Sequence, residues 1–346
     1  MSQNNPFCLS FGREPDRYVE RLEAYSQITD TFNSLSPSSN CYLIMGIRGI
    51  GKTVLLSSIS NEYRANEEWV VVSLNPGRDL LEMFASALYE DARLKHYFTD
   101  ASLNLSKFGI GLNIKKNPPI SDIQIALEKM VRIVNDKGKR ILITIDDITK
   151  NRDIISFASA FQDMLSKRME VFLLMTGLYE NIYSLQRDKR CTFLLRAEKI
   201  VLKPLNMIGM KNQYMQTFQC SDDEALSMAA FTKGYSYAFQ VLGYIMWDKD
   251  CSLEEAIPAF DEKMSGYCYE KVWEDLSEKE KEIICLLSHY GEMKAKEIID
   301  KTGSSSKAYS VHRDRLVKKG VVDGREHGTL RLLLPRFDIF VKSVSL

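Results

Sequence analysis

The sequence predicts an α/β protein whose parallel sheet is flanked by helices and is followed by a helical lid and a winged-helix domain. Three observations lead to this fold class. Short apolar strand-like runs alternate with helix-like segments over the first two-thirds of the chain, strand signals stop after Lys203 and Pro204, and the C-terminal part combines short helices with a strand–turn–strand. Alternation of strands and helices is typical of βαβ units, which build parallel sheets.

Four buried strands are expected in the first part, because each is a short apolar run ending near a turn or a polar residue. They lie at 41–45, 69–74, 140–145 and 171–176, with helical spacing at 54–63, 80–94 and 154–165. The stretch 102–119 interrupts the rhythm. Its alternating apolar residues and its glycines at 109 and 111 predict a β-hairpin insertion.

Helical patterns dominate the remainder of the chain. Residues 206–266 have helical spacing, and the pairs Ser252 with Glu255 and Ser277 with Glu280 fit capping boxes. Three short helices at about 278–289, 294–301 and 306–319, followed by strands near 321–324 and 329–334, form a winged-helix arrangement. We therefore expect an α/β domain, a helical lid and a winged-helix domain. Their expected bounds are 1–204, 205–270 and 271–346.

The composition excludes several classes of protein. The 346 residues include 46 Lys+Arg and 46 Asp+Glu, so there is no net charge, and 45% are hydrophobic, as in an ordinary globular protein. Disorder, collagen and coiled coils do not fit. No apolar run approaches the roughly 20 residues of a membrane helix. The polar N-terminal residues lack the basic-then-apolar pattern of a secretory signal. We expect no membrane association.

Seven cysteines are scattered along the chain without a Cys-x-x-Cys pair, and the four histidines do not cluster with them. This pattern predicts neither a disulfide framework nor a zinc site. Scattered cysteines usually act as small buried hydrophobes in a reducing compartment. We therefore expect a cytoplasmic protein.

The strongest functional signal is a phosphate-binding loop. Residues 46–53, G-I-R-G-I-G-K-T, match G-x-x-x-x-G-K-[ST] at every fixed position, after a predicted strand and at the start of a predicted helix. Glycines let N–H groups surround a phosphate, Lys52 neutralises the β- and γ-phosphates, and Thr53 offers its hydroxyl to Mg²⁺. A glycine-rich turn with an incidental lysine is the alternative. The predicted nucleotide-binding residues are Gly46, Ile47, Arg48, Gly49, Ile50, Gly51, Lys52, Thr53 and Val54.

A second motif supplies acids. The buried strand 140–145 ends at Asp146 and Asp147. An acid at the carboxyl end of such a strand suits a Walker B role, so we expect Asp146 and Thr53 to hold Mg²⁺. Asp147 is then the candidate for polarising the attacking water. Because Asp is one methylene shorter than Glu, we expect slow turnover. Two acids that merely begin a surface loop are the alternative.

These motifs resemble P-loop ATPases of the AAA+ and STAND group, in particular archaeal-ATPase-like proteins with a C-terminal winged helix. The resemblance rests on residues 46–56, on the lead-in at Asn5, Pro6 and Phe7 with Phe11 and Gly12, and on Ile145 to Ile148, which is closer to the STAND form of Walker B. It implies ATP or ADP with Mg²⁺ as ligands and adenine as the base. It covers nearly the whole chain.

The resemblance also suggests further site residues. Thr176 ends a strand at the sensor 1 position, where it would contact the γ-phosphate or the attacking water. Arg196 would sense nucleotide or act as a finger on a neighbouring subunit, with Arg187 and Arg190 as rivals and a surface arginine as the plain alternative. Arg21, in the pair Glu20–Arg21, takes the place of a family Gly-Arg pair near the adenine, and Gly12–Arg13 is its competitor. Residues 234–238 look like the sensor 2 region without its arginine.

A basic excess at the C-terminus suggests double-stranded DNA as a partner. Residues 307–342 contain nine Lys or Arg and four Asp or Glu. The start of the third short helix would enter a major groove, as recognition helices do. The candidate contacts are Lys307, Tyr309, Arg313 and Arg325, with Ser305, Ser306, Ser310, Arg315, His327 and Lys342 extending the surface. A solvated basic face, or a protein-binding winged helix, is the alternative.

Two functions therefore remain after the sequence alone. One is an Mg²⁺-dependent ATPase that couples nucleotide state to a winged helix able to bind DNA. The other is a switch that holds ADP or ATP without turnover and whose winged helix binds a protein partner. A homo-oligomer is compatible with either function. A DNA-binding regulator with a degenerate nucleotide site is a third, weaker hypothesis.

Overall fold

The computed structural model describes residues 4–10, 15–100, 105, 108, 110, 122–324 and 328–345. The chain forms two compact units. The unit called here the sheet unit contains residues 22–45 and 52–201, and the other, called the helical unit, contains residues 1–21, 46–51 and 202–346. The predicted hairpin at 102–119 falls almost wholly outside the described residues.

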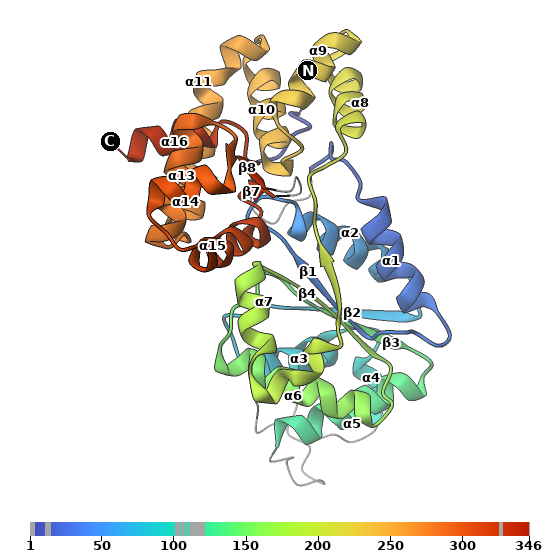
Figure 1. Cartoon of the computed structure of the whole chain (residues 1–346). Coiled ribbons are helices and arrows are strands. Elements are labelled where there is room, and N and C mark those ends of the chain that lie inside the picture. The colour runs from blue at the N-terminus through green and yellow to red at the C-terminus, as the bar shows by residue number, and fades with distance from the viewer. Residues whose placement is uncertain are drawn as a thin grey trace. The chain divides into compact units, whose positions relative to one another are not determined.

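A five-stranded parallel sheet forms the centre of the sheet unit (Figure 1). Its order is β2-β3-β4-β1-β5, and every pair of neighbours is parallel. The strands are β1 (Cys41–Met45), β2 (Trp69–Leu74), β3 (Arg140–Ile145), β4 (Val171–Gly177) and β5 (Glu198–Val201). The four predicted strands are confirmed. The sequence did not predict β5, a four-residue edge strand whose side chains are mostly exposed.

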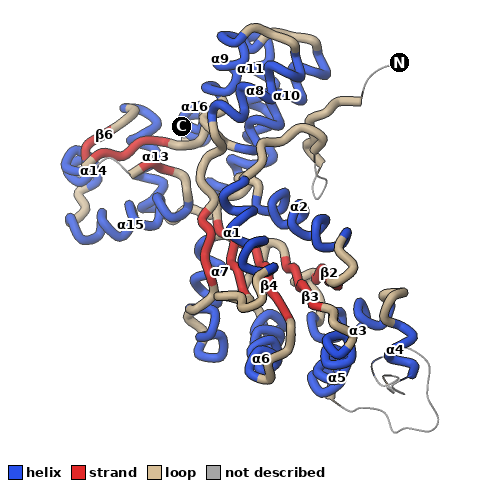
Figure 2. The backbone as a smooth tube through the Cα atoms, turned by 90° about the vertical axis from the view of Figure 1, so that its right-hand side faces the viewer, coloured by secondary structure: helices blue, strands red, loops and turns tan. Residues whose placement is uncertain are grey.

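Helices cover both faces of this sheet (Figures 1 and 2). One face packs against α1 (Leu22–Asn33) and α2 (Lys52–Ala65), where aromatic rings such as Phe32 and Phe172 lie 5.0 Å apart between centroids. The other face packs against α3 (Leu80–Glu90), α5 (Ile123–Asp136), α6 (Arg152–Ser166) and α7 (Tyr179–Gln186), with α4 (Lys95–Asp100) and η2 (Lys189–Leu195) beside them. Burial from both faces explains why β1, β3 and β4 are predominantly apolar.

This topology brings three strand ends together. Because β3, β4 and β1 are neighbours and parallel, their carboxyl ends meet at one edge of the sheet. The residues that follow β1 and β3, and the last residues of β4, are the predicted site residues. Ligands of open α/β sheets bind at this kind of edge.

The helical unit contains helices in its first part and a small sheet in its second. Its elements are α8 (Met207–Phe218), α9 (Asp222–Phe231), α10 (Ser236–Lys249), α11 (Leu253–Met264), η3 (Ser265–Tyr269), α12 (Glu270–Glu274), α13 (Glu278–Tyr290), β6 (Met293–Lys294), α14 (Ala295–Thr302), α15 (Ser306–Lys319), β7 (Val322–Asp323), β8 (Thr329–Leu332) and α16 (Phe337–Val344). Both predicted capping boxes are confirmed: Glu255 and Glu280 accept the backbone N–H of Ser252 and Ser277 at 2.9 and 2.8 Å.

The C-terminal elements follow the predicted order of three helices and two strands. The strand β6 adds a third member, giving an antiparallel sheet of order β6-β8-β7. The sequence did not predict α16, which buries Phe337 and Phe340 against Tyr269, with ring centroids 5.0 and 5.8 Å from that ring. Arg336, just before α16, forms two hydrogen bonds of 2.6 Å with Asp261 of α11.

The N-terminal lead-in packs on α10. Phe7 is buried, and its ring centroid lies 5.6 Å from that of Phe239. A Cβ at Gly243 would approach the Phe7 ring to 2.4 Å, so this glycine makes room for the aromatic side chain. Residues 1–21 therefore belong to the helical unit.

Among the described residues, no helix is long and apolar enough to cross a bilayer. All seven cysteines have free thiols.

Candidate functional site

Asp146 lies at the centre of a polar cluster in the sheet unit. The Thr53 hydroxyl donates to Asp146 Oδ2 at 2.8 Å, and the Thr176 hydroxyl donates to Asp146 Oδ1. Thr176 is completely buried and accepts the backbone N–H of Asp147 at 2.9 Å. We call Thr53, Asp146 and Thr176 the Asp146 cluster. Two hydroxyl groups thus fix the orientation of one carboxylate.

Asp147 differs from its neighbour. Its backbone adopts the left-handed region, with φ of 51°, which Asp tolerates better than most residues. Its side chain is exposed and has no hydrogen bond or ion pair with the described residues. The Asp147 carboxylate is therefore accessible, and no side chain in the described part of the chain orients it.

The lysine of the phosphate-loop motif begins a helix. Lys52 is the first residue of α2 and is 8% exposed, and Thr53 and Val54 follow it in the first turn. The N-terminus of a helix carries unpaired N–H groups and a partial positive charge. Lys52 adds a full charge at this point, so the start of α2 is suited to an anion such as a phosphate.

Residues 46–51 belong to the helical unit, where they form a loop with buried apolar side chains at Ile47 and Ile50. Gly49 and Gly51 have φ of 71° and 98°, a region that favours glycine. The motif glycines at these two positions are therefore required by the backbone itself.

The carbonyl groups of this loop bind residues just before and within α10. The Tyr235 hydroxyl donates to Arg48 O, the Tyr237 N–H donates to Gly49 O at 3.0 Å, and the Ser236 hydroxyl donates to Ile50 O at 2.8 Å. No side chain caps the N-terminus of α10, and the Gly49 carbonyl accepts an N–H group there instead. Three carbonyl oxygens that would repel a phosphate are thus already hydrogen-bonded.

Arg21 completes this arrangement. Its guanidinium donates to Ile50 O at 2.6 Å, to Lys203 O at 2.7 Å and to Ser236 Oγ at 3.2 Å. Burial lowers the pKa of Arg21 to about 10, so the group stays charged at neutral pH. We call Arg21 and residues 235–237, which bind the carbonyl groups of residues 48–50, the loop clasp. The resemblance suggested an adenine contact for Arg21, but here its guanidinium is bound to the phosphate loop.

The loop also contacts the C-terminal elements. Arg48 Nε lies 3.3 Å from Asp275 Oδ2, and a Cβ at Gly320 would lie 3.5 Å from Ile47 Cβ. Lys319 then donates to Asp275 O at 2.8 Å and to the buried Glu280 carboxylate at 2.9 Å. A continuous polar chain therefore runs from the phosphate loop to α13 and α15.

The three candidate arginines of the sheet unit differ in their partners. Arg187 stacks on Tyr183, 4.2 Å from its ring centroid, and Arg190 pairs with Asp188 at 3.0 Å. Arg196 is exposed, and its guanidinium has no partner in the described part of the chain. Of the three, Arg196 is the one available for an external ligand or subunit.

The predicted DNA-contacting face of α15 requires a correction. Tyr309 is 4% exposed, because it lies two helical turns before the buried Leu316 on the same side of α15. It therefore does not contribute to an exposed face. Arg313 donates to Gly324 O at 2.6 Å and supports the loop after β7. Arg325 and His327 lie outside the described residues.

Other basic residues of this region are paired internally. Lys318 binds Asp314, Lys319 binds Glu280, Arg331 binds Asp323, Arg336 binds Asp261 and Lys342 binds Asp338. Among the described basic residues between 307 and 342, only Lys307 and Arg315 are exposed and have no hydrogen bond or ion pair with another described residue. Two of these acids, Glu280 and Asp261, lie outside residues 307–342, so they offset only part of the excess charge counted in the sequence.

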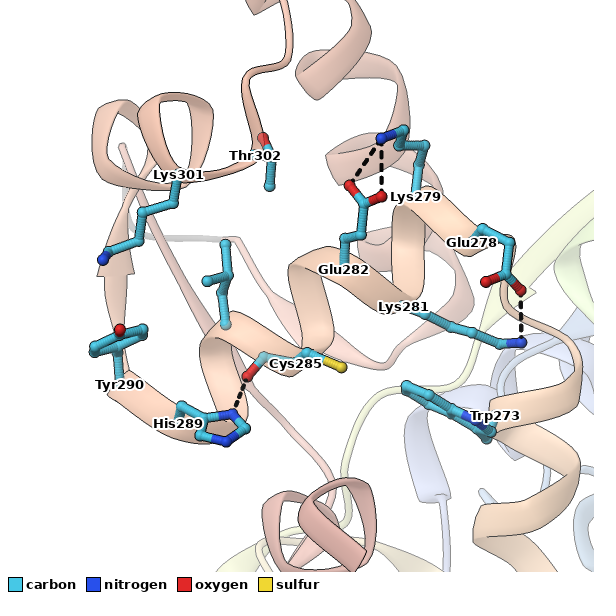
Figure 3. A pocket seen from close by; sticks show the side chains of 11 residues that line it. Trp273, Glu278, Lys279, Lys281, Glu282, Cys285, His289, Tyr290, Lys301 and Thr302 are labelled. Atoms are coloured by element: carbon cyan, nitrogen blue, oxygen red, sulfur yellow. Dashed lines mark hydrogen bonds and ion pairs between the residues drawn. The ribbon is translucent and has the colours of Figure 1, made fainter. Parts of the chain in front are cut away.

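A hollow of about 720 Å³ lies beside α13 (Figure 3). Its charged side chains pair with one another: Lys279 with Glu282 at 2.8 Å and Lys281 with Glu278 at 2.9 Å. Lys301 lies 4.3 Å from the ring centroid of Tyr290. The cations that line this hollow therefore already have anionic or aromatic partners.

Several solved structures have a similar fold. A Walker-type ATPase of Pyrococcus abyssi has a TM-score of 0.66 at 14% identity, covering 97% of this chain and 99% of that chain. The Orc2 protein of Aeropyrum pernix, in ADPNP–ADP complexes, has a TM-score of 0.62 at 15% identity, covering 96% of each chain. Cdc6p of Pyrobaculum aerophilum has a TM-score of 0.50 at 14% identity, covering 97% and 96%.

The chain therefore has the fold of the AAA+ P-loop ATPases, as the resemblance predicted. A domain of unknown function, DUF8462, matches residues 267–341, the C-terminal part of the helical unit. No curated protein matches the sequence.

Proposed function

We propose that this chain is an ATP-binding, Mg²⁺-dependent P-loop ATPase of the AAA+/STAND type that couples its nucleotide state to a C-terminal winged helix. The observation that carries the proposal is the 2.8 Å hydrogen bond from Thr53 to Asp146. It joins the phosphate-loop motif to the acid after β3, although 93 residues separate them in the sequence.

The protein groups fit the ligands that this activity needs. Residues 46–54 supply the phosphate-binding backbone, and Lys52 balances the charge of the β- and γ-phosphates. Thr53 and Asp146 offer one hydroxyl and one carboxylate oxygen to Mg²⁺, which typically keeps several waters and binds phosphate oxygens as well. Bound Mg²⁺ neutralises charge on the transferred phosphoryl group. Thr176 acts as a positioning residue for Asp146.

The hydrolytic residues follow from the same geometry. Asp147 is the proposed base for the attacking water because its carboxylate is accessible. Because no side chain orients it, turnover is slow. Arg196 is the proposed finger, since its guanidinium is exposed and without a described partner. A neighbouring subunit would receive this arginine, so the proposal includes a homo-oligomer.

The nucleotide state is coupled to the C-terminal elements through the polar contacts from Arg48 to Asp275 and from Asp275 to Lys319. A change of the phosphate loop on nucleotide binding displaces Arg48 and Ile47, and with them the contacts to Asp275 and Gly320.

We propose residues 1–204, 205–270 and 271–346 as α/β domain, lid and winged helix. Lys307 and Arg315, two exposed basic residues of α15, would contact double-stranded DNA in the cytoplasm.

The alternative is a switch that retains ADP or ATP without turnover and whose winged helix binds a protein partner. The observation that favours it is the unoriented Asp147, which contrasts with the doubly bonded Asp146. Both functions need the same phosphate loop and differ only in hydrolysis.

Calorimetric titration of Mg·ATP into wild type and Lys52→Ala tests the site. Loss of charge-assisted hydrogen bonds to phosphate costs about 1.5–3 kcal/mol each, so affinity should fall roughly 10- to 100-fold or more. Lys129→Ala, an exposed lysine of α5, is the control and should bind as wild type does. Equal affinity of wild type and Lys52→Ala would contradict the proposal.

Steady turnover then separates the two functions. An ATPase releases phosphate continuously and loses this activity in Asp147→Asn while still binding ATP. A switch retains ADP after purification and releases no phosphate.

A further inference from the structure

A second hollow lies in the helical unit, next to residues 203–207, the end of α9 and the strand β8. Its volume is about 590 Å³, and three cationic side chains line it, Lys203, Lys233 and Arg331. They come from three segments that are far apart in the sequence. The other described lining residues are apolar or glycine, and none is acidic.

The charges in this hollow are poorly neutralised. Lys203 and Lys233 are exposed, and neither ammonium has a hydrogen bond or ion pair with the described residues. Arg331 pairs with Asp323 at 3.1 Å, but its side chain remains 56% exposed. Burial lowers the pKa of Lys233, and the nearby Arg331 lowers it further, against the opposite effect of Asp338. The hollow beside α13 differs, because its lysines have partners (Figure 3).

The backbone beneath these cations is tightly packed. Lys233 adopts the left-handed region, with φ of 49°, at a cost of about 1 kcal/mol for a residue other than glycine. Gly234 follows, and its carbonyl accepts the Leu205 N–H at 2.7 Å. A Cβ at Gly234 would lie 2.7 Å from Pro204 Cβ. The two segments that carry Lys203 and Lys233 are thus held against each other, so the lysines need no large rearrangement to act together.

We propose that Lys203, Lys233 and Arg331 form a binding site for a phosphate group, separate from the phosphate loop. Two lysines without an ion pair among the described residues, and an arginine with N–H groups besides the one that binds Asp323, match the charge and the donors that a phosphate requires. The apolar remainder of the lining suits the part of a ligand that carries the phosphate. The phosphate comes either from a DNA backbone or from a small soluble ligand.

The site adjoins the loop clasp. Arg21 binds both Lys203 O and Ile50 O, and Gly234 directly precedes Tyr235 and Ser236, which bind Arg48 O and Ile50 O. A phosphate bound between Lys203 and Lys233 therefore acts on the same segments that hold the phosphate loop. This link predicts that the two ligands influence each other's affinity, but binding at the new site does not require ATP.

The test uses the full chain with Lys52→Ala, so that the phosphate loop does not contribute. Lys203→Gln with Lys233→Asn removes two cations, and Asn tolerates the left-handed backbone at 233. Lys249→Gln, an exposed lysine of α10, is the matched control. Unchanged circular dichroism confirms that each variant folds.

One arm titrates inorganic phosphate at constant ionic strength and follows the melting temperature. The other measures the affinity of a short duplex DNA by fluorescence anisotropy between 50 and 200 mM salt. Loss of two phosphate contacts should reduce the slope of log K against log salt by about 1.8. Loss of phosphate-induced stabilisation in the double variant identifies a soluble ligand, and a reduced slope identifies the DNA backbone.

Equal behaviour of the double variant and Lys249→Gln in both arms would overturn the inference. A Lys307→Gln/Arg315→Gln variant separates it from the proposed function. If DNA affinity falls in that variant alone, α15 binds DNA and the hollow does not.

Discussion

The Asp146 cluster and the loop clasp serve the same phosphate-loop motif in different ways. The Asp146 cluster consists of groups that can contact Mg²⁺ or phosphate, and all of them lie at the ends of strands or at the start of α2. The loop clasp binds carbonyl oxygens of residues 48–50 through groups from distant segments. The comparison suggests that chemistry and loop shape are assigned to separate sets of residues.

This separation predicts two kinds of variant. Substitutions in the loop clasp should lower stability with little direct effect on phosphate chemistry, whereas substitutions in the Asp146 cluster should lower turnover with little effect on stability.

The largest effect is expected for Arg21→Ala. The substitution removes a charged donor from two carbonyl groups and one hydroxyl, which should lower the free energy of unfolding by roughly 3 kcal/mol. Urea titration followed by circular dichroism measures this. The control is Arg48→Ala, whose half-exposed ion pair with Asp275 should contribute under about 1 kcal/mol. Similar losses in both variants would contradict a special role for Arg21.

A smaller effect is expected for Thr176→Val, which removes one hydroxyl from Asp146 and one acceptor from the Asp147 N–H. Loss of a hydrogen bond to a charged group costs about 1.5–3 kcal/mol, so kcat should fall roughly 10- to 100-fold. Phosphate release measures kcat at saturating ATP. Thr176→Ser keeps the hydroxyl and should retain most activity; a loss as large as that of valine would point to packing instead.

The smallest effect is expected for the pH dependence of stability that Glu280 confers. This residue belongs to the polar chain of contacts between the phosphate loop and α13. Burial alone would raise the pKa of Glu280, but hydrogen bonds from Lys319 and Ser277 and the charge of Lys319 hold it below the ordinary 4.5. A depressed pKa gives stability that is present above about pH 4.5 and is lost as the pH falls through the folded-state pKa. We expect on the order of 1 kcal/mol.

Urea titrations of wild type and Glu280→Gln at pH 7 and pH 3 measure this contribution. The stability difference between the two proteins should shrink at pH 3, where the wild-type carboxyl is protonated. A difference that does not change with pH would show that the charge of Glu280 contributes nothing.

Much of the sheet unit could be predicted from local sequence. Buried parallel strands are continuous apolar runs, so β1 to β4 were recognised, and Asp146 and Thr53 could be assigned because each follows such a run. By contrast, β5 lacks a distinctive local pattern, because it is a short edge strand with one buried residue. The helix α16 was not predicted either, although its apolar residues have helical spacing. The sequence singled out Arg21 and residues 234–238 through the resemblance, but it did not show that Arg21 and Tyr235 bind carbonyl groups of the phosphate loop, because these partners are remote along the chain.

The sequence by itself determined the alternation of strands and helices, the phosphate-loop motif, the acid after β3 and the capping boxes, because each depends on neighbouring residues. Only the tertiary structure decided which side chains are available. It buried Tyr309, paired most described basic residues of the C-terminal segment, and brought Lys203 and Lys233 into one hollow that no described acidic residue lines. Burial and ion pairing depend on contacts between remote segments, and a linear pattern does not contain them.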